Sequence, residues 1–158
     1  MSMVVQLFAN KQFDSSLEPL IKGLRECFGF STKASFIFLA SYGLKFSDRI
    51  SGTITKTFDT RGPEWRDDTN LELQPAINVL LERQGKIFGY NFQEVRTDSA
   101  ALKKCIDELM KIANATGDMM LNSELSSYKK GVASAAKQDF IVIVSGYLKE
   151  LAEVSEPF

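Results

Sequence analysis

The chain has 158 residues, of which 44% are hydrophobic and 25% are charged, proportions typical of a single globular domain. It has 19 Lys and Arg residues and 20 Asp and Glu residues, and the resulting net charge of −1 does not favour non-specific binding to nucleic acid. There is no histidine, which excludes the commonest general base and the commonest metal ligand.

The first predicted helix spans residues 15–28. Ser15 and Glu18 have the spacing of a capping box, apolar residues recur every three or four positions, and Gly29 offers a C-terminal stop. The second predicted helix begins at Ser31, ends at Gly43 and is apolar on nearly every side, which is typical of a helix at the centre of a core. Such a short apolar run is also compatible with a strand, although the serine and the glycine favour a helix.

Residues 45–74 are the least regular part of the sequence. The alternating, β-branched run at residues 54–58 predicts a short strand, and residues 61–70, which include the only tryptophan, Trp65, read as a loop. A third helix is predicted over residues 74–84, with Pro75 in its first turn and Gly85 at its end. The pattern of residues 86–95 fits a helix and an extended segment equally well.

The clearest helical pattern begins at Asp98 or Ser99 and runs to Thr116, before Gly117. A shorter helix is predicted from Met119 to about Leu125. The last predicted helix covers residues 138–153, and six large side chains share one of its faces: Phe140, Ile143, Val144, Tyr147, Leu148 and Leu151. If the core does not need this face, residues 138–158 form a C-terminal docking helix for a groove on a partner.

These elements predict a mainly α fold for a single domain over residues 1–158. We expect a compact bundle of five to six helices, with at most a short β element near residues 53–58. The two cysteines, Cys27 and Cys105, fall in predicted helices and are interpreted as small core residues. No apolar run approaches the roughly 20 residues that span a bilayer, and no basic stretch precedes the apolar N-terminus. We therefore expect a cytoplasmic protein with no membrane partner, no cofactor and no bound metal.

One segment, from residue 45 to residue 66, combines basic and aromatic side chains that could contact a ligand. Its candidates are Lys45, Arg49, Lys56, Arg61, Trp65 and Arg66. Cationic groups contact phosphates and an indole ring stacks on bases, so DNA contact is one interpretation. A protein anchor built around Trp65 is a second, and an ordinary surface loop is a third.

The residues are compatible with two further functions. The helices predicted at 15–28 and 31–43 are close enough for a helix-turn-helix regulator, but the second is too apolar to lie in a DNA groove. Asp67 and Asp68, with Lys86, could assemble a small metal-dependent nuclease, although adjacent acids in a loop usually form a solvated turn.

The stretch Gly29-Phe-Ser-Thr-Lys-Ala-Ser-Phe-Ile-Phe-Leu-Ala-Ser-Tyr-Gly-Leu44 resembles a motif of the small Dnd-system-associated proteins, which accompany DNA phosphorothioation and related bacterial anti-phage islands. Lys33, Phe38, Ala40 and Gly43 are the matching positions, and the later Ile112-Ala-Asn-Ala-Thr-Gly117 is similar to the closing element of that family. The resemblance implies a small cytosolic accessory subunit in a multi-gene defence system, with no catalytic residues to carry over. We therefore expect a protein that is not an enzyme and that binds larger ATPase or nuclease subunits, with DNA as a further contact.

Overall fold

A computed structural model describes residues 13–50 and 73–153 of the chain. Within these ranges it contains six α-helices and no β-strand, which confirms the mainly α fold. The helices are α2 (Glu18–Phe28), α3 (Thr32–Lys45), α5 (Gln74–Phe88), α6 (Phe92–Thr97), α7 (Ser99–Leu121) and α8 (Lys137–Ala152). The strand predicted near residues 53–58 lies outside the described residues.

Short polar side chains begin several of these helices. Ser31 accepts a hydrogen bond from the Ala34 amide at the start of α3, and Asp98 accepts one from the Ala100 amide at the start of α7, both as the sequence predicts. The capping box predicted between Ser15 and Glu18 is wrong. Asp14 is the cap, because its carboxylate accepts from the Ser16 amide and the chain first makes the 3₁₀ turn Ser15–Leu17 before α2 begins.

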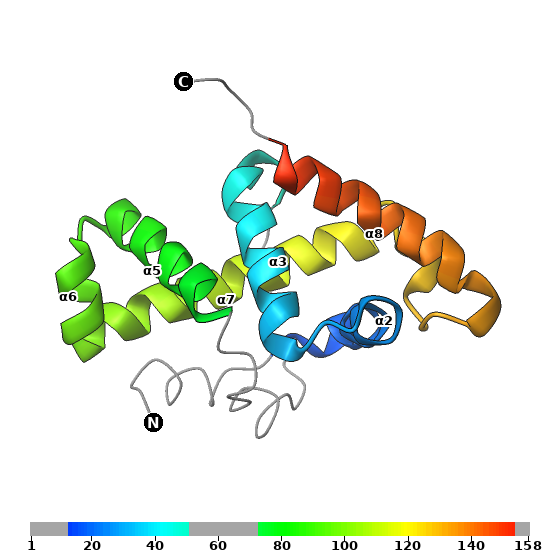
Figure 1. The fold of residues 1–158 in the computed structure, drawn as a ribbon, viewed down its shortest axis with the longest axis horizontal. Helices are drawn as coiled ribbons and strands as arrows, with labels where there is room; N and C mark the ends of the chain where they lie inside the picture. The colour runs from blue at the N-terminus through cyan, green and yellow to red at the C-terminus, as the bar shows by residue number, and fades with distance from the viewer. Residues whose placement is uncertain (1–12, 51–72, 154–158) are drawn as a thin grey trace.

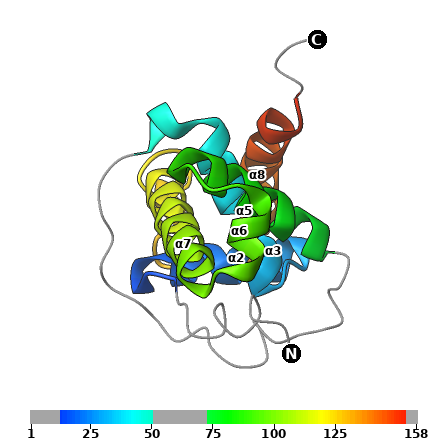
Figure 2. The same ribbon diagram turned by 90° about the vertical axis from the view of Figure 1, so that its left-hand side faces the viewer.

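The longest helix, α7, forms the axis of the molecule (Figure 1). At one end α5 and α6 pack against its N-terminal half, and Figure 2 faces this end. At the other end lie α2 and α8, which contact each other. Helix α3 crosses α7 between the two groups and also contacts α2, α5 and α8. The central position predicted for the 31–43 helix is therefore confirmed.

Two sets of large side chains fill the space where α3 crosses α7. Phe36, Leu39 and Tyr42 of α3 are fully buried, as are the α7 residues Leu102, Ile106 and Leu109. Each apolar side chain of this size stabilises the fold by about 1.5–3 kcal/mol when it leaves water. The α3–α7 crossing is thus the centre of the hydrophobic core, and it holds the two ends of the molecule together.

Two glycines end helices because their backbone is left-handed. Gly29 has φ +70° after α2, as predicted, and Gly89 has φ +85° after α5. Side chains other than that of glycine are strained in this conformation. The predicted end of the third helix at Gly85 is wrong, since α5 continues to Phe88 before Gly89 stops it.

The other predicted glycine stops lie inside helices at close contacts. A Cβ on Gly43 would collide with Thr116 and Ile112 of α7, and a Cβ on Gly117 would lie 2.8 Å from a methyl carbon of Leu17. Gly85 similarly faces Val95 of α6, 2.6 Å from the position of a Cβ. These glycines allow close packing between elements, so α3 runs on to Lys45 and α7 to Leu121 instead of ending at them.

Two further segments are settled by the structure. The ambiguous residues 86–95 form the last turn of α5 and the start of α6, where Asn91 and Glu94 make a capping box. The separate helix predicted from Met119 is wrong, because Met119–Leu121 are the last residues of α7 and only a 3₁₀ turn, Ser126–Tyr128, follows.

A buried polar contact fixes the N-terminal end of the described chain to the middle of α7. The Asp14 amide donates to Asn114 Oδ1 at 2.9 Å, and both residues are buried. Thr116 Oγ1, also buried, donates to the Ile112 carbonyl one turn earlier. The Asn114 and Thr116 of the family-like closing element are therefore structural residues in this fold. None of the helices described is both long and apolar enough to cross a membrane.

Candidate partner-binding surface

Lys45, the first of the predicted contact residues, is the last residue of α3. Its side chain reaches the C-terminal end of α8. Its Nζ donates to the carbonyl oxygens of Glu150 at 3.0 Å and Leu151 at 3.2 Å, and also to that of Glu153. The last carbonyls of a helix have no partner within the helix and carry partial negative charge. Lys45 is therefore a C-terminal cap supplied by another helix.

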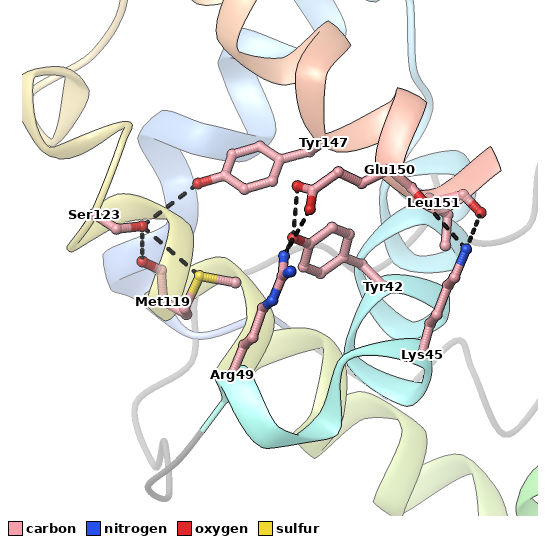
Figure 3. A network of polar contacts seen from close by, with 8 residues as sticks. All are labelled: Tyr42, Lys45, Arg49, Met119, Ser123, Tyr147, Glu150 and Leu151. Atoms are coloured by element: carbon pink, nitrogen blue, oxygen red, sulfur yellow. Dashed lines mark hydrogen bonds and ion pairs between the residues drawn. The ribbon is translucent and has the colours of Figure 1, made fainter. Parts of the chain in front are cut away.

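Arg49, the second predicted contact residue, lies in the 3₁₀ turn Ser47–Arg49 and joins the same end of α8. Its guanidinium donates to Glu150 Oε2 at 2.8 Å and to the Tyr42 hydroxyl at 2.6 Å, and it stacks 4.2 Å from the centre of the Phe46 ring. The Tyr42 hydroxyl in turn donates to Glu150 Oε1 at 3.1 Å. Figure 3 shows the hydrogen bonds among Tyr42, Arg49 and Glu150. We call Tyr42, Lys45, Arg49 and Glu150 the α3–α8 clasp.

Two members of the clasp, Tyr42 and Glu150, have pKa values that are shifted in opposite directions. Burial, followed by the hydrogen bond to the Glu150 carboxylate, raises the pKa of Tyr42 to about 12. The hydrogen bond from Arg49 lowers the pKa of Glu150. In the folded chain Glu150 stays a carboxylate to lower pH than usual, and Tyr42 stays neutral to higher pH than usual. Together with the cations Lys45 and Arg49, these two groups bind α8 to α3.

The clasp changes the interpretation of the predicted contact segment. The charges of Lys45 and Arg49 are both engaged within the chain, where they hold α8 instead of facing outward as free cations. The other four candidates, Lys56, Arg61, Trp65 and Arg66, lie outside the described residues, as do Asp67 and Asp68. DNA contact through this segment stays a prediction.

The apolar face predicted for α8 points into the molecule. Phe140, Val144 and Tyr147 are buried, and the other three residues of that face, Ile143, Leu148 and Leu151, are half-buried against the core. Tyr147 meets Tyr42 edge to face at 5.4 Å, and its hydroxyl lies 3.4 Å from Ser123 Oγ (Figure 3). In the described residues this face packs against the core, and residues 154–158 of the predicted docking helix lie outside them.

A different helix presents apolar side chains outward. Of the described residues, three large hydrophobic side chains are exposed, and two of them, Val79 at 54% and Ile87 at 66%, lie on α5. Arg83 and Lys86 are exposed between them in the sequence. Positions i, i+4, i+7 and i+8 share one side of a helix. We call Val79, Arg83, Lys86 and Ile87 the α5 outer face.

Among the described residues, positive charge is found on this face and beside one end of it. Lys86 has one loose ion pair, 3.7 Å from Glu82 on the same helix, and the part of the chain described gives Arg83 no ion pair or hydrogen bond. Beside the end of α5, Lys104 of α7 lies over the half-buried rings of Phe88, at 4.5 Å, and Tyr90, at 5.9 Å. Three cations and one carboxylate thus accompany the exposed aliphatic residues.

Sequence reasoning did not find the α5 outer face. Ending the third helix at Gly85 removed Ile87 from it, and Val79 then stood alone beside the buried stripe of Ile77, Leu80 and Leu81. Extending the helix to Gly89 would have shown two aliphatic residues eight positions apart on the polar side. This irregularity in an otherwise amphipathic pattern was the available signal.

The structure also bears on the alternatives weighed from the sequence. Helix α3 has nine buried residues, so it cannot serve as the exposed recognition helix of a helix-turn-helix protein in this arrangement. In the two described ranges no group of three or more Cys, Asp or Glu side chains is placed to hold a metal ion. Both cysteines are reduced, and burial raises the pKa of each thiol, which disfavours the nucleophilic thiolate.

Comparisons of the chain with protein-family models, with curated proteins and with solved structures found no match. The resemblance to the Dnd-system-associated proteins therefore stays a prediction from the two motifs.

Proposed function

We propose that the chain is a non-catalytic accessory subunit that binds a larger protein through the α5 outer face. In the setting that the motif resemblance suggests, the partner is an ATPase or nuclease subunit of a bacterial anti-phage or DNA-processing system, and the complex is cytoplasmic. DNA is a further contact of that complex in this proposal.

The observation that carries the proposal is the exposure of Val79 and Ile87 on one side of α5. Isolated apolar side chains on a surface are common, but two on one helical face with two exposed cations between them combine apolar anchors with charged groups, as binding surfaces do. Burying a side chain of this size contributes about 1.5–3 kcal/mol. Two such residues can supply a useful part of the free energy of binding.

Co-purification with matched variants tests the proposal. The tagged full-length chain, produced in its native host, is compared with the double variant V79D/I87D and with V142D, which changes the third exposed hydrophobic residue at 61% exposure on α8. All three should give the same helical circular dichroism, because the altered side chains lie on the surface. We expect a stoichiometric larger protein to accompany the wild type and V142D but not V79D/I87D.

Two results would contradict the proposal. If the same partner is retained by V79D/I87D, the α5 outer face is not the binding surface. If the purified chain alone hydrolyses nucleotide or DNA, it is not a non-catalytic subunit.

A further inference from the structure

The side chains of the α5 outer face form a narrow strip with apolar residues at its ends and cations between them. At about 100° per residue, positions 79, 83, 86 and 87 span roughly a quarter to a third of the helix circumference, and at 1.5 Å per residue they cover about 12 Å along the axis. These dimensions match the contact that one amphipathic helix makes with another over two turns. The strip is too narrow to contact more than one helix of a partner. It is long enough for two apolar side chains of that helix to bind to it.

The charge of this region selects the chemistry of the occupant. Arg83 is exposed, Lys86 is held only loosely by Glu82, and Lys104 lies over two rings rather than against a carboxylate. The whole chain has a net charge of −1, so this local excess of cations does not reflect a basic chain. A partner carrying acidic side chains beside its apolar anchors would pair with these cations.

The apolar side chains of the face distinguish a protein from a nucleic acid. Val79 and Ile87 are aliphatic, so they offer bases neither a stacking surface nor a hydrogen bond. The rings of Phe88 and Tyr90 are half-buried, and Lys104 lies over both. A second copy of the chain is disfavoured as well, because an isologous dimer through this face would bring like charges together.

We propose that the α5 outer face binds an acidic amphipathic helix, with apolar side chains on Val79 and Ile87 and carboxylates on Arg83, Lys86 and Lys104. The inference deepens the proposed function and rests on it for the biological source of the helix. The surface chemistry itself can be tested without the native partner.

The probe is a displayed library of short random peptides, selected on the full-length chain and counter-selected on V79D/I87D. The enriched peptides should combine helical apolar spacing with an excess of Asp and Glu. One enriched peptide is then measured against R83E/K86E and against K129E/K130E, which makes the same charge change at two exposed lysines beside the 3₁₀ turn Ser126–Tyr128. We expect R83E/K86E to weaken binding about tenfold or more at low salt and K129E/K130E to change it by less than about twofold.

Several outcomes would overturn the inference. Enrichment of neutral or basic peptides, or equal binding to R83E/K86E and the wild type, would show that the cations do not select the ligand. Tighter binding of a labelled single-stranded oligonucleotide than of the peptide, lost in R83E/K86E, would assign the face to nucleic acid. A concentration-dependent dimer abolished by V79D/I87D would assign it to a second copy.

The proposed function and this inference can fail separately. Loss of the native partner in V79D/I87D without any effect of R83E/K86E keeps the function and rejects the acidic helix. If acidic amphipathic peptides are enriched but no native partner depends on Val79 and Ile87, the acidic helix is kept and the proposed function is rejected.

Discussion

Gly23 of α2 packs against the ring of Phe140 on α8. A Cβ placed on Gly23 would be 2.7 Å from Cζ of that ring and 3.0 Å from a methyl carbon of Val132. Phe140 is itself fully buried and meets Tyr128 edge to face at 5.5 Å, so the ring has little room to move. The contact between α2 and α8 therefore depends on the missing side chain of Gly23.

We predict that G23A destabilises the protein by about 1 kcal/mol although alanine is the better helix former. The helical preference gains up to about 1 kcal/mol, but inserting a methyl group against a fixed ring costs about 1–3 kcal/mol. The control is G146A on α8, where a Cβ meets nothing within 4 Å and the helical preference should appear as a gain of about 0.5–1 kcal/mol. Urea unfolding measures both, and a G23A variant as stable as G146A would contradict the packing.

The buried amide of Asp14 gives a second prediction. N114A removes its acceptor and leaves an unpaired N–H in the core, at an expected cost of about 1–3 kcal/mol. N122A is the matched control, because Asn122 is exposed and bonds only within its own turn of α7. Its effect should stay within about 0.5 kcal/mol. Equal unfolding midpoints for the two variants would show that the Asp14–Asn114 bond does not hold the N-terminal segment.

The Glu150 carboxylate predicts a dependence on acidic pH. Its pKa is lowered in the folded chain by Arg49, so its contribution to stability is complete above the ordinary value of 4.5 and is lost as the pH falls through the folded pKa. The difference in the free energy of unfolding between the wild type and E150Q should be small but constant near neutrality and should shrink below pH 4.5. If the difference in the free energy of unfolding between the wild type and E150Q grows as the pH falls, Glu150 is not stabilised as a carboxylate in the folded chain. That result would contradict the clasp.

Tyr42 predicts a dependence of stability on alkaline pH. Its pKa is raised from 10.0 to about 12, so the folded chain keeps the phenol proton that the unfolded chain releases, and this stability is complete below pH 10 and lost as the pH rises toward 12. An ultraviolet titration should show a tyrosine component near pH 12 that Y42F removes. If Y42F leaves that component unchanged, the phenol is not held against Glu150.

Local physics was enough to predict most of the helices. The side chains of Ser31 and Asp98 accept hydrogen bonds from backbone amides at helix starts, and such residues can be recognised where an amphipathic pattern follows them. The apolar periodicity of α7 can likewise be predicted without knowing what packs against the helix. The roles of the glycines could not be predicted in this way. Gly29 ends a helix through its φ, whereas Gly43 and Gly117 lie inside helices, where the missing side chain leaves room for Thr116, Ile112 and Leu17. That difference depends on contacts between distant parts of the chain.

The same limit applies to the candidate site. The sequence identified Lys45 and Arg49 as cations that could bind a ligand, but their actual partners belong to α8, about a hundred residues later. The apolar stripe of α8 could equally serve a core or a partner, and only the packing of α2 and α3 against it decides. Val79 and Ile87 were missed because a wrong helix end separated them.

A photocrosslinking amino acid at single positions of the full-length chain tests the central claim most directly. Placed at Ile87 or Val79 in cells of the native host, it should capture one larger protein, and placed at Val142 it should capture none. The same covalent product from both α5 positions would put the partner on the α5 outer face. Capture from Val142 alone, or no product from α5 beside a partner that co-purifies, would contradict the account.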